Sequence, residues 1–208
     1  MKYEDSREQV LDAATKVFAE RGFHAATVRQ ICKAASMNVA MVNYYFGSKE
    51  KLYEEVVRRN FSFATTEEMA QLAEGVTDEE SWRAAVRRFV EKFAGYMSVT
   101  TEPGVYAARI FRWELTQPSS VSPELQVTYG HVAYEALKSL VMMALVEDTM
   151  AVKMWCSAVW SRLVTLALVD ASWLQHFIPK DMTREEWVRH VVDNICETVF
   201  ATMHYQRR

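Results

Sequence analysis

Helix start signals recur along the chain, and they limit its fold more than any other feature. The pattern Ser or Thr, two residues, then Glu or Gln lets two side chains satisfy free backbone N–H groups in a first helical turn. It occurs at residues 6–9, 27–30, 77–80 and 183–186. No strand-like alternation of apolar and polar residues competes with these signals, so we expect an all-α protein.

Apolar residues at helical spacing and breaks at Gly and Pro set the expected bounds of about nine helices. Asn38 and the Ser122-Pro123 pair supply further caps. We expect helices at about 6–22, 27–35, 39–45, 49–72, 77–98, 103–118, 122–146, 148–173 and 183–205. Only 6 Gly and 4 Pro are present, which argues against a β-sandwich rich in turns.

Composition excludes several classes of protein. Cys32, Cys156 and Cys196 are far apart and form no C-x-x-C pair, so neither a disulfide framework nor a zinc cluster is expected. We expect no cofactor and no metal. The first residues are acidic without an apolar signal segment, and the apolar stretch 154–169 contains Arg162 and is too short to span a membrane. A cytoplasmic protein without a membrane partner is expected.

Residues 27–46 have the pattern of a helix-turn-helix, in which two short capped helices are joined by a tight turn. Residues 1–60 carry 10 basic and 8 acidic side chains, whereas the whole chain has a net charge of −3. The segment 21–49 contains Arg21, Arg29, Lys33 and Lys49 and no Asp or Glu. Such a segment approaches phosphate without like-charge repulsion, which indicates DNA binding through the second helix.

Residues 6–59 resemble the DNA-binding domain of the TetR family of bacterial transcriptional regulators. The residues that carry the resemblance are Ala13, Ala14, Phe18, Gly22, Phe23, the run 27–31 and the run 43–52. The resemblance implies a DNA-binding domain at 1–60 and a helical domain for effector binding and dimerisation at 61–208. Where the family often has Gly in the turn and Tyr on the recognition helix, this chain has Ser36 and Asn43.

The resemblance also implies roles for single residues. The candidate DNA-binding residues are Thr27, Arg29, Asn38, Val39, Ala40, Asn43, Tyr44, Tyr45 and Lys49. Thr27, Arg29, Tyr44, Tyr45 and Lys49 match backbone-contacting positions, with base contact by Thr27 and Arg29 left open. Asn43 is the first candidate for reading a base, because an amide pairs with adenine through two hydrogen bonds. Met41, Val42 and Phe46 are expected in the core.

In this family, helices five to seven enclose a small-molecule pocket. The candidate pocket residues are Phe93, Met97, Tyr106, Arg109, Phe111, Trp113, Tyr134 and Met142. Large apolar side chains with polar tips line ligand sites, but aromatic and Met residues at helical spacing also form ordinary cores. Arg112 and Glu114 are further candidates for a polar ligand group. Residues 109–118 are similar to a subgroup linked to efflux and drug-sensitivity control.

The stretch 154–169 is apolar nearly all round, so its helix needs burial on more than one side. A homodimer supplies the second side and matches a palindromic operator, while the alternative is a central helix of a monomeric bundle. The candidate interface residues are Trp155, Val159, Trp160, Leu163, Val191, Ile195 and Val199. His190 and Asp193 have the spacing of a metal pair, but no third ligand is in view.

These patterns favour a transcriptional repressor that a small molecule releases from a palindromic operator on double-stranded DNA. A regulator whose ligand promotes DNA binding is the alternative. An all-helical enzyme is a remote alternative, since the chain has no G-x-S-x-G, P-loop, H-E-x-x-H or Gly-rich dinucleotide motif. A helical interaction protein that has lost DNA binding is disfavoured by the acid-free segment.

Overall fold

A computed structural model describes residues 3–61, 71–97, 104–121, 123, 131–144, 150–168, 176 and 178–204. Within these ranges the chain forms nine helices and no strand, which confirms the all-α prediction. The helices are α1 (Tyr3–Ala25), α2 (Val28–Ala34), α3 (Val39–Phe46), α4 (Lys49–Phe61), α6 (Glu79–Met97), α7 (Gly104–Thr116), α9 (His131–Met142), α10 (Met150–Leu168) and α12 (Arg184–Thr202).

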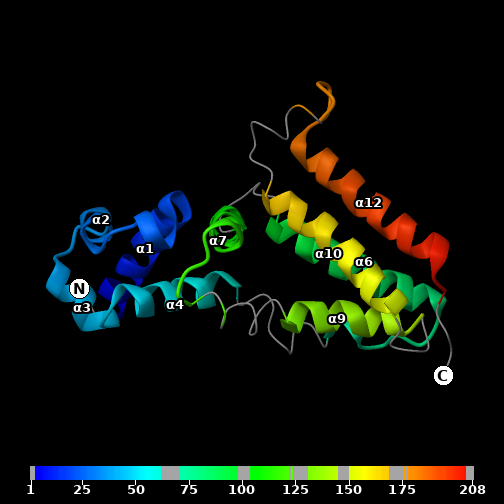
Figure 1. The fold of residues 1–208 in the computed structure, drawn as a ribbon, viewed down its shortest axis with the longest axis horizontal. Helices are drawn as coiled ribbons and strands as arrows, with labels where there is room; N and C mark the ends of the chain where they lie inside the picture. Colours follow the sequence, from blue (N-terminus) through cyan, green and yellow to red (C-terminus); the bar gives the residue numbers. More distant parts are fainter. Residues whose placement is uncertain are drawn as a thin grey trace.

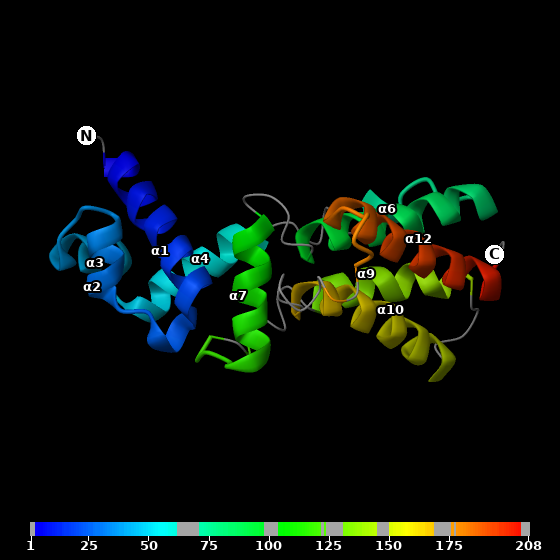
Figure 2. The same ribbon diagram turned by 90° about the horizontal axis from the view of Figure 1, so that it is seen from above.

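The helices form two groups that meet at α7. Helices α1 to α4 lie together at one end, and α6, α9, α10 and α12 lie at the other, with α7 between them in both views (Figures 1 and 2). Helix α7 contacts α1 and α4 on one side and α6 and α10 on the other. Among the described residues, no helix is both long and apolar enough to cross a membrane.

Most of the predicted helix starts are confirmed. Thr27 and Thr183 each form a complete capping box with the residue three positions later. The Asn38 side chain accepts a hydrogen bond from the Met41 backbone N–H at 2.9 Å, and the Ser48 hydroxyl accepts one from Lys51 at 3.2 Å. Each of these bonds satisfies a backbone donor that a helix start leaves without a partner.

Two predicted starts are wrong. Helix α1 begins at Tyr3, so Ser6 lies inside it and is only 6% exposed, facing the core rather than capping a helix end. At α6 the cap shifts by one residue from Thr77, because the Asp78 carboxylate accepts the Ser81 backbone N–H at 2.8 Å. The predicted helical stretches at 62–70, 124–130, 145–149, 169–175 and beyond 204 lie outside the described residues.

Gly22 was predicted to end the first helix, but α1 resumes after it and runs to Ala25. Gly22 has φ 72° and ψ 171°, which makes a kink within α1. This conformation is almost restricted to glycine. The kink precedes the last residues of α1, which lead to α2. Gly47 also has a positive φ, of 78°, and it ends α3.

The core extends from the small helices into the long ones. In the first group Phe18 meets Tyr53 edge to face, with ring centroids 4.8 Å apart. In the second group the buried Trp82 donates its indole N–H to the Leu140 carbonyl at 2.8 Å. The buried residues of both groups form one continuous hydrophobic cluster, so neither half packs independently of the other.

The turn between α2 and α3 contains a residue in an unfavourable backbone conformation. Ser36 has φ 53°, the left-handed region that costs an L-residue roughly 1–2 kcal/mol. We therefore expect Ser36→Gly to stabilise the protein by about 0.5 kcal/mol, after the added entropy of glycine is subtracted. Urea unfolding measures the change. Ala34→Gly, at the last residue of α2, is the control and should destabilise the protein by at most about 1 kcal/mol. A loss of stability in Ser36→Gly would contradict this account.

Candidate nucleic-acid interface

Helices α2 and α3 form a helix-turn-helix held by buried apolar residues. In the turn, the Ala35 N–H donates to the Ile31 carbonyl at 2.8 Å, and the Met37 N–H donates to the Cys32 carbonyl at 2.9 Å. Ile31 and Cys32 are buried on α2, and Val42 and Phe46 are buried on α3, as expected for Val42 and Phe46. This packing fixes which side of α3 faces outward.

The outward side of α3 carries the residues predicted to contact DNA. Val39 is 40% exposed and Tyr44 is 71% exposed, which is unusual for large apolar and aromatic side chains. Ala40 and Asn43 lie on the same exposed side, and Asn38 is exposed at the cap. Because residues three and four positions apart share a helix face, these side chains form one continuous surface.

Tyr45 and Lys49 are less exposed than the other candidate residues. Tyr45 is half-buried, and its ring meets that of Tyr44 edge to face at 5.5 Å. The Lys49 ammonium lies 4.4 Å from the centroid of the Phe23 ring, a distance suited to a cation–π interaction. Burial lowers the pKa of Lys49 from its ordinary value, and the neighbouring Glu50 opposes this shift.

Helix α2, which packs against α3, also exposes basic side chains. Arg29 and Lys33 are exposed on α2, and Arg21 is exposed near the end of α1. Thr27 is also exposed, although its hydroxyl is engaged with Gln30 in the capping box. The exposed surface of residues 21–49, which we call the acid-free surface, presents cations without a carboxylate. It has the charge that a phosphate backbone requires.

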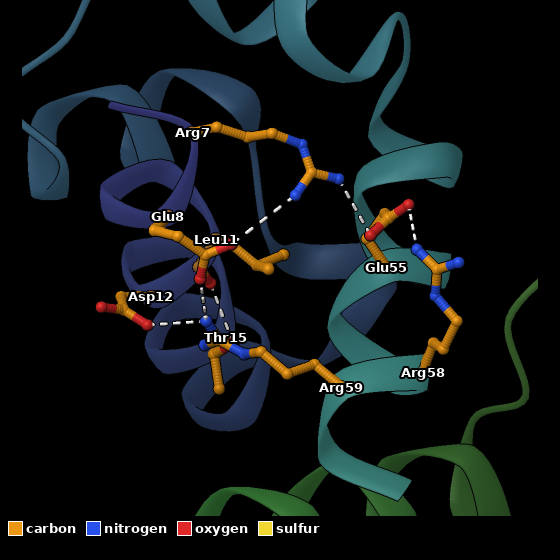
Figure 3. Close-up of polar contacts among 8 residues, drawn as sticks. All are labelled: Arg7, Glu8, Leu11, Asp12, Thr15, Glu55, Arg58 and Arg59. Atoms are coloured by element: carbon orange, nitrogen blue, oxygen red, sulfur yellow. Dashed lines mark hydrogen bonds and ion pairs between the residues drawn. The ribbon is translucent and has the colours of Figure 1, made fainter. Parts of the chain in front are cut away.

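An ion-pair cluster that sequence reasoning did not identify holds α1 against α4 (Figure 3). The Arg59 guanidinium lies 2.8 Å from the Asp12 carboxylate and donates to the Thr15 hydroxyl at 2.9 Å. Arg7 pairs with Glu55 at 3.0 Å, and Arg58 pairs with the same carboxylate. Hydrogen bonds from Arg58 and Arg7 lower the pKa of Glu55, against the opposing effect of its burial.

Arg7 also reaches the end of the recognition helix. Its guanidinium carbon lies 4.9 Å from the centroid of the Phe46 ring. Because the same side chain pairs with Glu55, it connects residues of α1, α3 and α4. The cluster thus helps to fix α3 relative to the two helices that support it. No local sequence signal identifies the pairs that join α1 to α4, since their partners lie more than 40 residues apart.

Helix α7 is joined to the first group of helices by side chains of its second half. The Trp113 indole N–H donates to the Ala19 carbonyl at 3.1 Å, and its ring lies directly against Gly22. The His24 ring is 3.0 Å from the Pro118 carbonyl, and Phe61 meets Phe111 with centroids 6.3 Å apart. These contacts attach α7 to α1 and α4 at several points.

A buried polar group reinforces the same joint. The Tyr53 hydroxyl of α4 donates to Glu114 of α7 at 2.6 Å, and Glu114 also accepts from the backbone and hydroxyl of Ser119. Tyr53 is fully buried and Glu114 is 9% exposed. Burial raises the pKa of Tyr53 well above its ordinary value, and the hydrogen bond to Glu114 is the next largest cause of this rise. Glu114 is therefore bound within the protein in this structure.

The candidate pocket residues lie on three helices. Phe93 and Met97 are buried on α6, and Phe93 stacks on Phe89 at 4.8 Å and contacts Trp160 at 5.4 Å. The others are partly buried: Tyr106, Arg109, Phe111 and Trp113 on α7, and Tyr134 and Met142 on α9. Phe111 and Trp113 contact α4 and α1, which places them at the joint between the two groups of helices.

The candidate dimer residues divide into two sets. Val159, Leu163, Ile195 and Val199 are at most 3% exposed within a single chain. They form its core, so an interface with a second copy has to use other residues of α10 and α12. Trp155, Trp160 and Val191 are partly buried. Met150 and Met154, at 72% and 66% exposed, are the most exposed large apolar side chains of α10.

The carboxylate of the His190 and Asp193 pair has another partner in the structure. Asp193, which has metal-pair spacing with His190, instead accepts a hydrogen bond from Arg87 at 2.7 Å. Among the residues that the structure describes, no three His, Cys, Asp or Glu side chains are grouped as metal ligands.

Comparison with known proteins identifies the first group of helices. Residues 10–56 match the family described as bacterial regulatory proteins, tetR family. The transcriptional repressor NicS of Pseudomonas putida is 42% identical over 57 residues, covering 27% of this chain and 27% of its own length. The transcriptional repressor AcnR of Corynebacterium efficiens is 27% identical over 125 residues, covering 60% of this chain and 56% of its own length.

The fold beyond the matched domain is also similar to that of solved regulators. The structure of the transcriptional regulator FadR from Bacillus subtilis, in complex with stearoyl-CoA, covers 95% of this chain and 99% of its own, with a TM-score of 0.67 and 16% identity. The chain matches only between 27% and 56% of the length of the two curated relatives above. The helix-turn-helix and the family match identify residues 10–56 as a DNA-binding domain of the TetR family of bacterial regulators, and the whole chain shares its all-helical fold with solved regulators.

Proposed function

We propose that this chain is a repressor that binds a palindromic operator as a homodimer and is released by a small molecule. The observation that carries the proposal is the acid-free surface, which combines the exposed side chains of α3 with the exposed Arg29 and Lys33 of the adjoining α2. A recognition helix between phosphate-binding cations has the composition that a major groove requires. The match of residues 10–56 to a family of regulatory proteins argues against the enzyme alternative.

The proposed route from ligand to DNA runs through α7. Tyr106, Arg109, Phe111 and Trp113 lie on this helix, and its second half is bonded to α1 and α4. A ligand that displaces α7 therefore displaces the helices that support α3. The ligand has to bind the released conformation more tightly than the DNA-bound one, because only a difference in affinity shifts the equilibrium. FadR, solved with stearoyl-CoA, supports a ligand site in this fold.

The proposed dimer interface uses the exposed residues of α10 and α12. Arg162 of α10 donates to Asn194 and Thr198 of α12 at 3.4 and 3.3 Å, which connects two helices that both pack on α6. Met150 and Met154 add exposed apolar surface to α10. Burying such side chains against a second copy is favourable and relates two recognition helices by a two-fold axis.

The proposed DNA interface is tested by the salt dependence of operator binding. A duplex selected from the DNA flanking the gene is titrated with the protein, at several salt concentrations, by fluorescence anisotropy. We expect two chains per duplex, and we expect Arg29→Ala with Lys49→Ala to weaken binding. The slope of log K against log salt should become shallower by about 3.6, since two chains each lose two phosphate contacts and each contact contributes roughly 0.9.

Lys180 and Arg88 are exposed basic residues outside the acid-free surface, so Lys180→Ala with Arg88→Ala is the matched control for charge. The control should leave the slope unchanged. Binding that does not depend on salt, or an equal loss in both double variants, would reject the proposed interface.

A further inference from the structure

Helix α3 has no charged side chain on any face. Its sequence from Val39 to Phe46 contains no Lys, Arg, Asp or Glu. Guanine is most often read by Arg or Lys, whose donors pair with O6 and N7, and cytosine by Asp or Glu. The recognition helix therefore lacks the usual readers of a G·C pair. Its exposed side offers only an amide, apolar groups and the Tyr44 ring.

The two amides near this surface are not equivalent. The Asn38 Oδ1 atom accepts the Met41 N–H at 2.9 Å, so it is occupied by capping α3. Reading adenine requires both amide atoms, one accepting from N6 and the other donating to N7. Asn43 is exposed, and its side chain makes no hydrogen bond to the part of the chain that the structure describes. Asn43 thus has both atoms available for a base.

Val39 precedes Asn43 by one helical turn, about 6 Å along the axis, which is close to the separation of one to two base pairs. Val39 is 40% exposed and is followed by the exposed Ala40. An apolar side chain in a major groove has one apolar group to contact, the C5-methyl of thymine. The amide and the apolar pair therefore select for A·T pairs at neighbouring positions.

We propose that α3 reads a short A·T element in each half-site. In this element Asn43 pairs with an adenine, and Val39 with Ala40 contacts the methyl of a thymine one or two steps away. The inference rests on the proposed function, because it names the base pairs that the same surface recognises. It assigns the sequence preference of α3 to three side chains and leaves phosphate binding to Arg29 and Lys49.

The inference is tested by selecting duplexes from a random-sequence library with the full-length protein. We expect adjacent A·T pairs to be enriched in both half-sites. In the selected duplex, 7-deaza-adenine at the enriched adenine should weaken binding about tenfold, since it removes the N7 acceptor. Replacing the enriched thymine by deoxyuridine should weaken binding about threefold to fourfold, since it removes one methyl group.

Variants connect each base to its side chain. Asn43→Ala should bind duplexes with and without 7-deaza-adenine equally. Val39→Ala should lose less affinity than wild type when thymine is replaced by deoxyuridine, but it should still lose affinity when adenine is replaced by 7-deaza-adenine. Lys49→Ala is the control, because a phosphate contact weakens binding to all sequences by the same factor. Thermal melting checks that Asn43→Ala is folded, as expected for an exposed side chain without a hydrogen bond.

One outcome would overturn the inference but not the proposed DNA binding. In it, the selected duplexes carry G·C pairs at the positions where Asn43→Ala loses its sequence preference. Sensitivity to 7-deaza-adenine that persists in Asn43→Ala would also overturn it. Failure to enrich any duplex, together with binding that does not respond to salt, would overturn the proposed function as well.

Discussion

Gly22→Ala should destabilise the protein by about 3 kcal/mol, the largest effect expected from a single added methyl group. The backbone at Gly22, with φ 72° and ψ 171°, costs an L-residue roughly 1–3 kcal/mol. A Cβ atom there would lie 2.9 Å from Cδ2 of Trp113. The ring cannot move away freely, because its indole N–H is bonded to the Ala19 carbonyl. Relieving such an overlap costs about 1–3 kcal/mol more.

Gly75→Ala separates the two contributions. Gly75 also has a positive φ of 74°, but nothing lies within 4 Å of its added Cβ. It should therefore lose about 1 kcal/mol, from the backbone alone. Urea unfolding of both variants gives the difference, and Gly22→Ala should also alter the tryptophan fluorescence. Equal losses in the two variants would show that the contact between Trp113 and Gly22 does not limit the packing of α1 on α7.

Tyr53→Phe should destabilise the protein by about 2 kcal/mol. The variant keeps the buried ring and its contact with Phe18 but removes the hydrogen bond to Glu114. A bond to a carboxylate contributes roughly 1.5–3 kcal/mol when the partner stays buried without it. Tyr44→Phe, at a side chain 71% exposed, is the matched control and should change stability by less than about 0.5 kcal/mol. Chemical denaturation at pH 7 measures both.

The same pair predicts how stability depends on alkaline pH. Burial raises the pKa of Tyr53 in the folded protein above that in the unfolded chain. The folded state then holds a proton that the unfolded state releases, so stability falls as pH rises above about 10. Wild type should lose about 1.4 kcal/mol per pH unit more than Tyr53→Phe in that range. Parallel pH profiles would contradict the role of the buried hydroxyl.

Helix starts that depend on four neighbouring residues were predictable from sequence. Thr27, Asn38 and Thr183 cap helices as expected, because each bond joins residues three positions apart. Ser6 has the same local pattern but lies inside α1, where its side chain is buried. A local signal therefore identifies a possible start, and the packing of the surrounding helix decides whether the start is used.

Contacts between distant segments were not predictable in this way. Trp113 has the spacing of a core or pocket residue, and the sequence does not show that its ring lies on Gly22, about 90 residues earlier. Arg59 and Asp12 also form part of the site's support without any shared motif. The exposed side of α3 was better predicted, because the apolar period of a short helix defines its opposite face.

The joint at α7 affects how regulators of this fold can be recombined. A chimera that carries residues 1–61 of this chain on the body of another regulator would set Gly22 and Tyr53 against foreign side chains. The chimera would also need Trp113, Glu114 and Ser119 from this chain, because these residues form the hydrogen bonds that hold α1 and α4 against α7. An exchange of the DNA-binding helices in this protein therefore has to carry the contacting residues of α7 and Ser119 with them.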